Sequence, residues 1–242
     1  MSQASQTTPR STVRTFQCPC GESFATTVYS TVNVTMEPEL LYRLLAGTFN
    51  VAACPNCGRK AASAQPFIYH DMARGLFAYV HPDADLPEDE REELLEHLRT
   101  VYDQAVAESE RLTQPSTGAG SGGHGAVEPR VRRLRPHDDA LKRLSPDAPP
   151  MQVIFGLEDL TALVESLLDA DEKLGRVTLS TKASGEPERQ RLFAVATRLA
   201  EQAHCLVEVE DLPAEYIAII YGSRARIRQL SAALKSLNQA GG

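Results

Sequence analysis

The apolar residues in 13–34 follow the two-residue period of a half-buried β-strand. Phe24, Val28 and Val32 have the same parity, and alternate side chains of a strand point to the same face. We therefore expect two β segments here, joined by a turn at Cys18–Gly21. Further β segments are expected around Pro66–Tyr69 and Leu76–Val80.

Two stretches of the N-terminal half have the spacing of amphipathic helices instead. A short helix is predicted over Pro38–Ala46, with Gly47 placed to end it. A longer helix is predicted over Pro87–Glu110, because proline suits a first helical turn and the acidic run Glu88–Glu93 meets the positive end of the helix dipole. Its apolar stripe consists of Leu94, Leu98, Val101, Tyr102 and Ala105.

The C-terminal part, residues 151–242, mixes both periods. Strands are expected at Val153–Phe155, around Val177 and Leu179, at Cys205–Val209 and at Tyr216–Tyr221. Helices are expected through Leu160–Leu168, over Pro187–Ala203 and over Ser223–Leu237. A turn at Asp211–Pro213 makes a hairpin of the last two strands. This mixed order predicts an α+β sandwich-type domain rather than a purely parallel sheet.

Between these two parts the periodic pattern stops. Residues 113–150 contain five Gly, six Pro and three Ser, and Gly118–Gly125 reads as a flexible linker. We therefore predict a disordered N-terminus over 1–12, a zinc-ribbon-like β domain with helices over 13–112, a flexible basic linker over 113–150 and a C-terminal α+β domain over 151–242.

The net charge of −7 is unevenly distributed. The two predicted folded domains carry −7 and −3, whereas the linker carries +2 and contains the run Arg130–Arg135. An average apolar fraction of 42% excludes disorder of the whole chain. The acidity of the folded parts disfavours binding through nucleic-acid phosphates, which needs Lys and Arg. No secretory signal or apolar span is visible, so we expect a cytoplasmic protein that is not membrane-bound.

Four of the five cysteines form two tight pairs. One residue separates Cys18 from Cys20, two residues separate Cys54 from Cys57, and a glycine follows each pair. Zinc takes four soft donors in a tetrahedron, and glycine permits the sharp turn that such a knuckle needs. We predict one structural zinc per chain. Three alternatives remain open: a Cys18–Cys20 redox couple, unpaired structural cysteines, and a zinc that takes His70 or another residue as its fourth ligand.

The same region resembles a known family. The stretches Cys18–Gly21, Leu44–Asn50, Cys54–Gly58 and Tyr69–Asp71 make residues 16–82 similar to the CpXC domain, a bacterial and archaeal family named for paired Cys-Pro-x-Cys motifs. The second cysteine motif fits that name fully, and the first, Cys-Pro-Cys, is one residue shorter. The resemblance implies a metal-binding domain without assigning a reaction, and no family resemblance is found for residues 151–242.

Other functional candidates are weaker. Tyr69, His70 and Asp71 resemble acid–base machinery, but neighbours on a strand point to opposite faces, so that a structural role at a strand end is favoured. Cys205 is predicted to be a core residue. Candidate contacts to an anion or a partner are the arginines of the linker and of the last helix: Arg130, Arg132, Arg133, Arg135, Arg224 and Arg228.

These observations favour a non-enzymatic adaptor or regulatory module with a structural zinc and a protein partner. Two alternatives come from other functional classes. A nucleic-acid-binding zinc-ribbon protein would use the arginines on phosphates, with affinity that falls steeply with salt. A thiol redox enzyme would use Cys18 and Cys20, and would need a thiol of low pKa.

Overall fold

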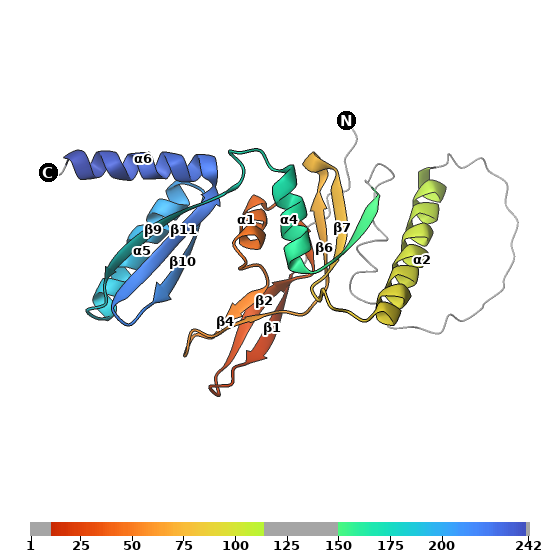
Figure 1. Cartoon of the computed structure of the whole chain (residues 1–242), viewed down its shortest axis with the longest axis horizontal. Helices are drawn as coiled ribbons and strands as arrows, with labels where there is room; N and C mark the ends of the chain where they lie inside the picture. Colours follow the sequence, from red (N-terminus) through yellow and green to blue (C-terminus); the bar gives the residue numbers. More distant parts are fainter. Residues whose placement is uncertain (1–10, 114–149, 241–242) are drawn as a thin grey trace, which may run out of the picture. The chain divides into compact units, whose positions relative to one another are not determined.

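The computed structural model describes residues 11–113 and 150–240 (Figure 1). They group into two compact units, each assembled from separate segments of the chain. Among the described residues, the first unit draws on 11–36, 54–59, 63–113 and 150–159, and the second on 37–53, 60–62 and 160–240. The predicted α+β class is confirmed. The domain boundaries, and the disorder of 1–12 and 113–150, stay predictions, because those segments lie almost wholly outside the described residues.

A four-stranded mixed sheet forms the core of the first unit. Its order is β3-β6-β7-β8, with β6 and β7 antiparallel and the two outer strands parallel to their neighbours. The strands are β3 (Thr31–Asn33), β6 (Phe67–Asp71), β7 (Leu76–His81) and β8 (Met151–Phe155). The short β8 was predicted as a strand from its apolar run, but its pairing with β7 was not. The N–H of Gly156 extends that pairing by donating to the carbonyl of His81 at 2.7 Å.

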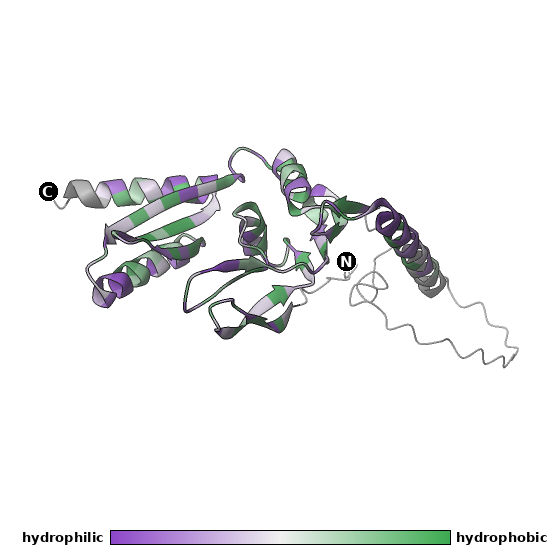
Figure 2. Cartoon of the chain, turned by 60° about the horizontal axis from the view of Figure 1, so that its bottom comes forward, coloured by the Kyte–Doolittle hydropathy of each residue, from purple (hydrophilic) through white to green (hydrophobic). Residues whose placement is uncertain are grey.

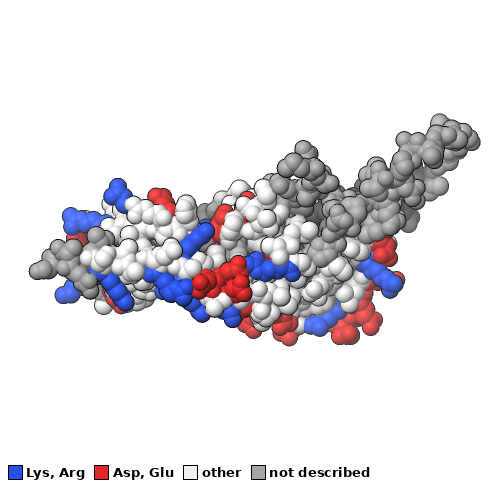
Figure 3. All heavy atoms as spheres, turned by 90° about the horizontal axis from the view of Figure 1, so that it is seen from above, with Lys and Arg blue, Asp and Glu red and all other residues white. Residues whose placement is uncertain are grey.

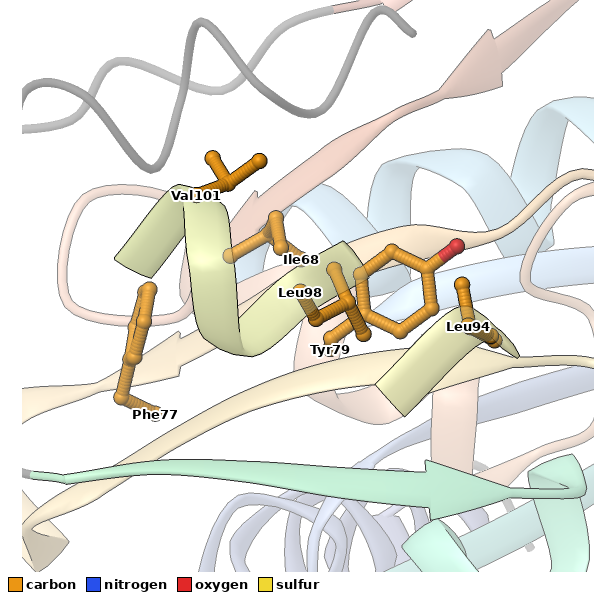
Figure 4. Packing of buried hydrophobic residues seen from close by; sticks show 6 residues of the cluster. All are labelled: Ile68, Phe77, Tyr79, Leu94, Leu98 and Val101. Carbon is orange, nitrogen blue, oxygen red and sulfur yellow. The ribbon is translucent and has the colours of Figure 1, made fainter. Parts of the chain in front are cut away.

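Helix α2 (Glu88–Thr113) packs against this sheet through the predicted stripe. Leu94, Leu98 and Val101 lie in one cluster with Ile68 and Tyr79 (Figure 4), and none of the three is more than 7% exposed. Most of the remaining helix surface is hydrophilic (Figure 2). The acidic residues Glu88, Asp89 and Glu90 occupy the first turn, where the helix dipole favours them.

Two small hairpins hold the cysteine turns. The first pairs β1 (Ser11–Gln17) with β2 (Ser23–Tyr29) over seven residues, around the turn that the sequence predicted, whereas Val32 of the same parity lies in β3 of the four-stranded sheet. The second pairs β4 (Val51–Ala53) with β5 (Lys60–Ala62) over three residues. Strands of three residues are too short to show a period, which is why β4 and β5 were not predicted.

The second unit is built on a three-stranded antiparallel sheet of order β10-β11-β9. The strands are β9 (Leu174–Lys182), β10 (Leu206–Asp211) and β11 (Glu215–Ser223). Ala218 and Ile220 of β11 share one buried cluster with α5 (Glu186–Gln202) and α6 (Arg224–Ala240). Both helices therefore cover the same face of this sheet. The apolar alternation along the strands is visible as coloured bands in Figure 2.

Helix α1 (Pro38–Leu45) also belongs to the second unit and contacts β10 and β11. The hydroxyl of Tyr42 donates to the carbonyl of Glu172 at 3.1 Å, and the hydroxyls of Thr48 and Tyr221 are 3.1 Å apart. Tyr221 has the parity opposite to Ile220, so α1 and its following loop lie on the sheet face that α5 and α6 leave open. Helix α4 (Leu157–Leu167) precedes β9. None of the helices in the described part of the chain is long and apolar enough to span a membrane.

Candidate metal centre

The turn between β1 and β2 presents Cys18 and Cys20. The N–H of Cys18 donates to the carbonyl of Glu22 at 2.8 Å, and the N–H of Gly21 donates back to the carbonyl of Cys18 at 2.9 Å. Gly21 has a φ of 94°, a conformation that side chains with a Cβ rarely adopt. The sharp turn predicted from this glycine is therefore present.

The turn between β4 and β5 has the same construction. The N–H of Cys54 donates to the carbonyl of Arg59, and the N–H of Gly58 donates to the carbonyl of Cys54, both at 2.9 Å. Gly58 has a φ of 70°. Cys54 is 3% exposed, whereas Cys57 is exposed. Each hairpin thus holds two thiols on a hydrogen-bonded loop.

The four sulfurs meet in one cluster. All four Sγ atoms lie within 4.8 Å of one another, and two contacts run between the cysteine turns: Cys18 to Cys57 at 3.5 Å and Cys20 to Cys54 at 3.6 Å. Around a tetrahedral zinc with Zn–S bonds of about 2.3 Å, neighbouring sulfurs stand about 3.8 Å apart. The donor set and its spacing therefore fit a metal ion, and the tight first pair does not prevent the fit.

The two thiols of the first cysteine turn have pKa values shifted in opposite directions. The backbone N–H of Glu22 and then the thiol of Cys18 lower the pKa of Cys20 to about 6. The backbone N–H of Cys20 lowers the pKa of Cys18, but desolvation and the neighbouring thiols outweigh it and raise that pKa to about 12. One thiolate forms easily, while a further negative charge beside it needs a compensating positive charge.

Asn56 is a residue that the sequence reasoning missed. Its side-chain amide donates to Cys20 Sγ at 3.8 Å, and such donors orient a metal ligand and stabilise its thiolate form. Its place between Cys54 and Cys57 is the signal that would have found it. His70 is not part of the group of potential metal ligands, which within residues 11–113 and 150–240 consists of the four cysteines.

A comparison with protein families matches the model of the CpXC protein family to residues 16–117. The N-terminal part of the chain is therefore similar to this family. The resemblance seen in the sequence is thereby confirmed, and the match extends beyond it to include α2. No curated protein and no solved structure matches the chain significantly.

Asp71, within the segment that matches the CpXC family, is held by an arginine rather than by the adjacent histidine. Its Oδ1 accepts the backbone N–H of Arg74 at 3.2 Å, and its Oδ2 pairs with Arg74 Nη1 at 2.8 Å. The carboxylate thus caps the short 3₁₀ turn Met72–Arg74, and its contacts are those of a strand-end cap. Burial raises the pKa of the neighbouring Tyr69, whose hydroxyl therefore stays protonated at neutral pH.

His70 is 9% exposed and packs edge-on against Phe77, with ring centroids 5.7 Å apart. Its Nδ1 has no hydrogen-bond partner within the described residues. Burial lowers the pKa of His70, against an opposing influence of Asp71. The imidazole is therefore held neutral in the folded chain at neutral pH.

This burial predicts that His70 makes stability depend on pH. In the unfolded chain the histidine gains a proton near its ordinary pKa of about 6.5, while the folded chain resists protonation. The free energy of unfolding should therefore fall as the pH falls from 7 towards 5.5. In the variant His70→Gln this free energy should fall less steeply. Urea unfolding at the two pH values, with metal content monitored, measures both slopes. Equal slopes would contradict the prediction.

The candidate arginines fall into two groups. Both Arg224 and Arg228 are exposed. Arg228 pairs with Asp171 at 2.6 Å, whereas no acidic partner is found for the side chain of Arg224 among the described residues. Cys205 is partly buried, and burial raises its pKa, in keeping with its predicted place in the core. The linker arginines Arg130, Arg132, Arg133 and Arg135 lie outside the described residues.

Proposed function

We propose that this chain is a non-enzymatic interaction protein, an adaptor or regulator, whose CpXC domain is stabilised by one structural zinc. The observation that carries the proposal is the cluster of four thiols within 4.8 Å, supplied by two hydrogen-bonded turns. Four protein ligands complete a tetrahedron and leave no position for a reactive water, which is the arrangement of structural zinc sites. A metal of this kind holds a surface in place rather than performing chemistry.

Zinc is favoured over other metals by the chemistry of the donors. Four thiolates in a tetrahedral arrangement select zinc or iron–sulfur chemistry, while hard cations prefer oxygen ligands. The Cys-x-Cys and Cys-x-x-Cys turns each carry the glycine that a zinc knuckle uses. A thiol redox enzyme would instead leave Cys18 and Cys20 without metal, so metal content separates the two functions.

Elemental analysis tests the proposal directly. We expect about one zinc per chain in protein purified without chelators, and thiols that react slowly until the metal is removed. Less than about half an equivalent of zinc, or disulfide exchange by the metal-loaded protein, would contradict it. Retardation of DNA or RNA at low salt, abolished at high salt, would favour the nucleic-acid alternative.

The affinity for zinc should depend on pH in a defined direction. Zinc binds thiolates, so protons compete with it wherever a ligand is a thiol in the free protein. Cys18 has a pKa of about 12, so the metal must displace its proton at neutral pH. Cys20 has a pKa of about 6, so the metal must displace a proton from it only in more acidic solution. Affinity should fall as the pH falls from 8 to 7, and more steeply below 6. Competition with a chromophoric chelator measures it, and affinity independent of pH would contradict the prediction.

A further inference from the structure

The strand β9 forms one edge of the C-terminal sheet (Figure 1). All nine of its residues pair with β11 in unbroken register, so that this strand contains no bulge. No other strand in the described part of the chain pairs with its outer side. An edge of this kind offers a row of backbone N–H and C=O groups to an incoming strand.

The edge is firmly anchored from within. Val177 and Leu179 pack into the cluster beneath α5 and α6. Gly175 lies so close to α6 that a Cβ there would stand 2.9 Å from the Cα of Arg224. A strand fixed in this way loses little conformational freedom when it binds, and this lowers the cost of association.

On the sheet face away from α5 and α6, the side chains of β9 are basic towards both ends of the strand and uncharged between them. Arg176 and Lys182 are exposed, and within the described residues neither forms a salt bridge, although Lys182 lies opposite Glu215 of β11 in the strand register. Thr178 and Ser180 lie exposed between them, and the strand contains no acidic residue and no proline. Exposed Arg224 adds a further positive charge beside Gly175. Figure 3 shows basic side chains along this unit.

The opposite edge, β10, does not neutralise these charges. Glu208 and Glu210 approach Lys60 of β5 at 3.7 and 3.5 Å, and Asp211 binds Arg189 of α5 at 2.9 Å. The acids of β10 are therefore engaged within their own unit. These acidic residues are also poorly placed to pair with the basic residues of β9 in a second copy of the chain. Pairing of β9 with β9 of a second copy would bring like charges together.

We propose that β9 binds an extended acidic segment of another protein, which adds to the C-terminal sheet as a fourth strand. Backbone hydrogen bonds would supply affinity, and acidic side chains opposite Arg176 and Lys182 would set the register. This inference rests on the proposed role as an interaction protein and names the surface and the partner chemistry of that role.

A designed peptide tests the proposal on the zinc-loaded full chain. The probe is a nine-residue capped peptide that alternates Glu with Val or Thr, and its matched control carries Lys in place of Glu. Fluorescence anisotropy should detect binding of the acidic peptide only, and hydrogen exchange should slow at β9 amides. The double variant R176E/K182E, altered at two exposed positions, should weaken binding about tenfold or more because two attractions become repulsions.

N-methylation of the peptide separates strand addition from simple charge attraction. Methyl groups on the amides that face β9 should abolish binding, while methyl groups on the alternate amides should leave it intact. Equal binding of the two methylated peptides, no binding of the acidic peptide, or self-association through β9 in its place would overturn the inference. The proposed function fails separately, through absent zinc or measured thiol chemistry.

Discussion

Replacing Cys54 with serine is expected to remove the metal from the chain and to open the second cysteine turn. Cys54 is the most buried of the four clustered cysteines, at 3% exposed, and its sulfur lies 3.6 Å from that of Cys20. Serine has nearly the same size but is a poor zinc ligand. Structural zinc contributes about 10 kcal/mol or more to the folding of small zinc modules. The loss of stability should therefore be large and confined to the region of the two cysteine turns. Elemental analysis should show zinc below about half an equivalent, and hydrogen exchange should quicken in both turns.

The matched control is Cys205→Ser, which makes the same chemical change in the other unit. Cys205 is not part of the sulfur cluster and packs beside the C-terminal core. We expect the zinc content of this variant to equal that of the wild type. The four-stranded sheet should persist in Cys54→Ser, because the packing of α2 on that sheet involves no cysteine. Full zinc content in Cys54→Ser would refute the assignment of this ligand.

The candidate metal site was predictable from the sequence because its signals are local. Two close cysteine pairs, each followed by glycine, indicate two turns without any knowledge of the fold. The contacts of sulfurs across the two turns were not predictable: Cys18 contacts Cys57, and Cys20 contacts Cys54. That arrangement depends on how the two hairpins face each other, which no local pattern specifies.

The fold divides in the same way between local and distant signals. The stripe on α2 follows from a period within one element, and both α2 and β11 overlap the elements that the sequence predicted. The partner of β8 was not predictable, because an apolar run of this length can pair with any open edge. Arg74 was missed for a related reason: its contact with Asp71 needs the 3₁₀ turn that brings it back to the strand end.

The second large effect on stability is expected from a substitution in the apolar stripe of α2. Leu98→Ala is expected to lower the free energy of unfolding by about 2–5 kcal/mol, the usual result of removing a buried leucine side chain and leaving a cavity. Leu98 is 2% exposed and packs against the sheet cluster of Ile68 and Tyr79 (Figure 4). Urea unfolding followed by far-ultraviolet circular dichroism, with zinc held constant, measures the change.

Leu95→Ala provides the matched control on the same helix. Leu95 is 43% exposed, so this variant should change the free energy of unfolding by no more than about 0.5 kcal/mol. Both variants replace leucine with alanine inside α2, and the change in intrinsic helix propensity is therefore the same. The difference between them isolates the packing of α2 on the sheet. Equal effects of the two substitutions would mean that α2 is held by its own helical stability rather than by the sheet, because only packing distinguishes the two positions.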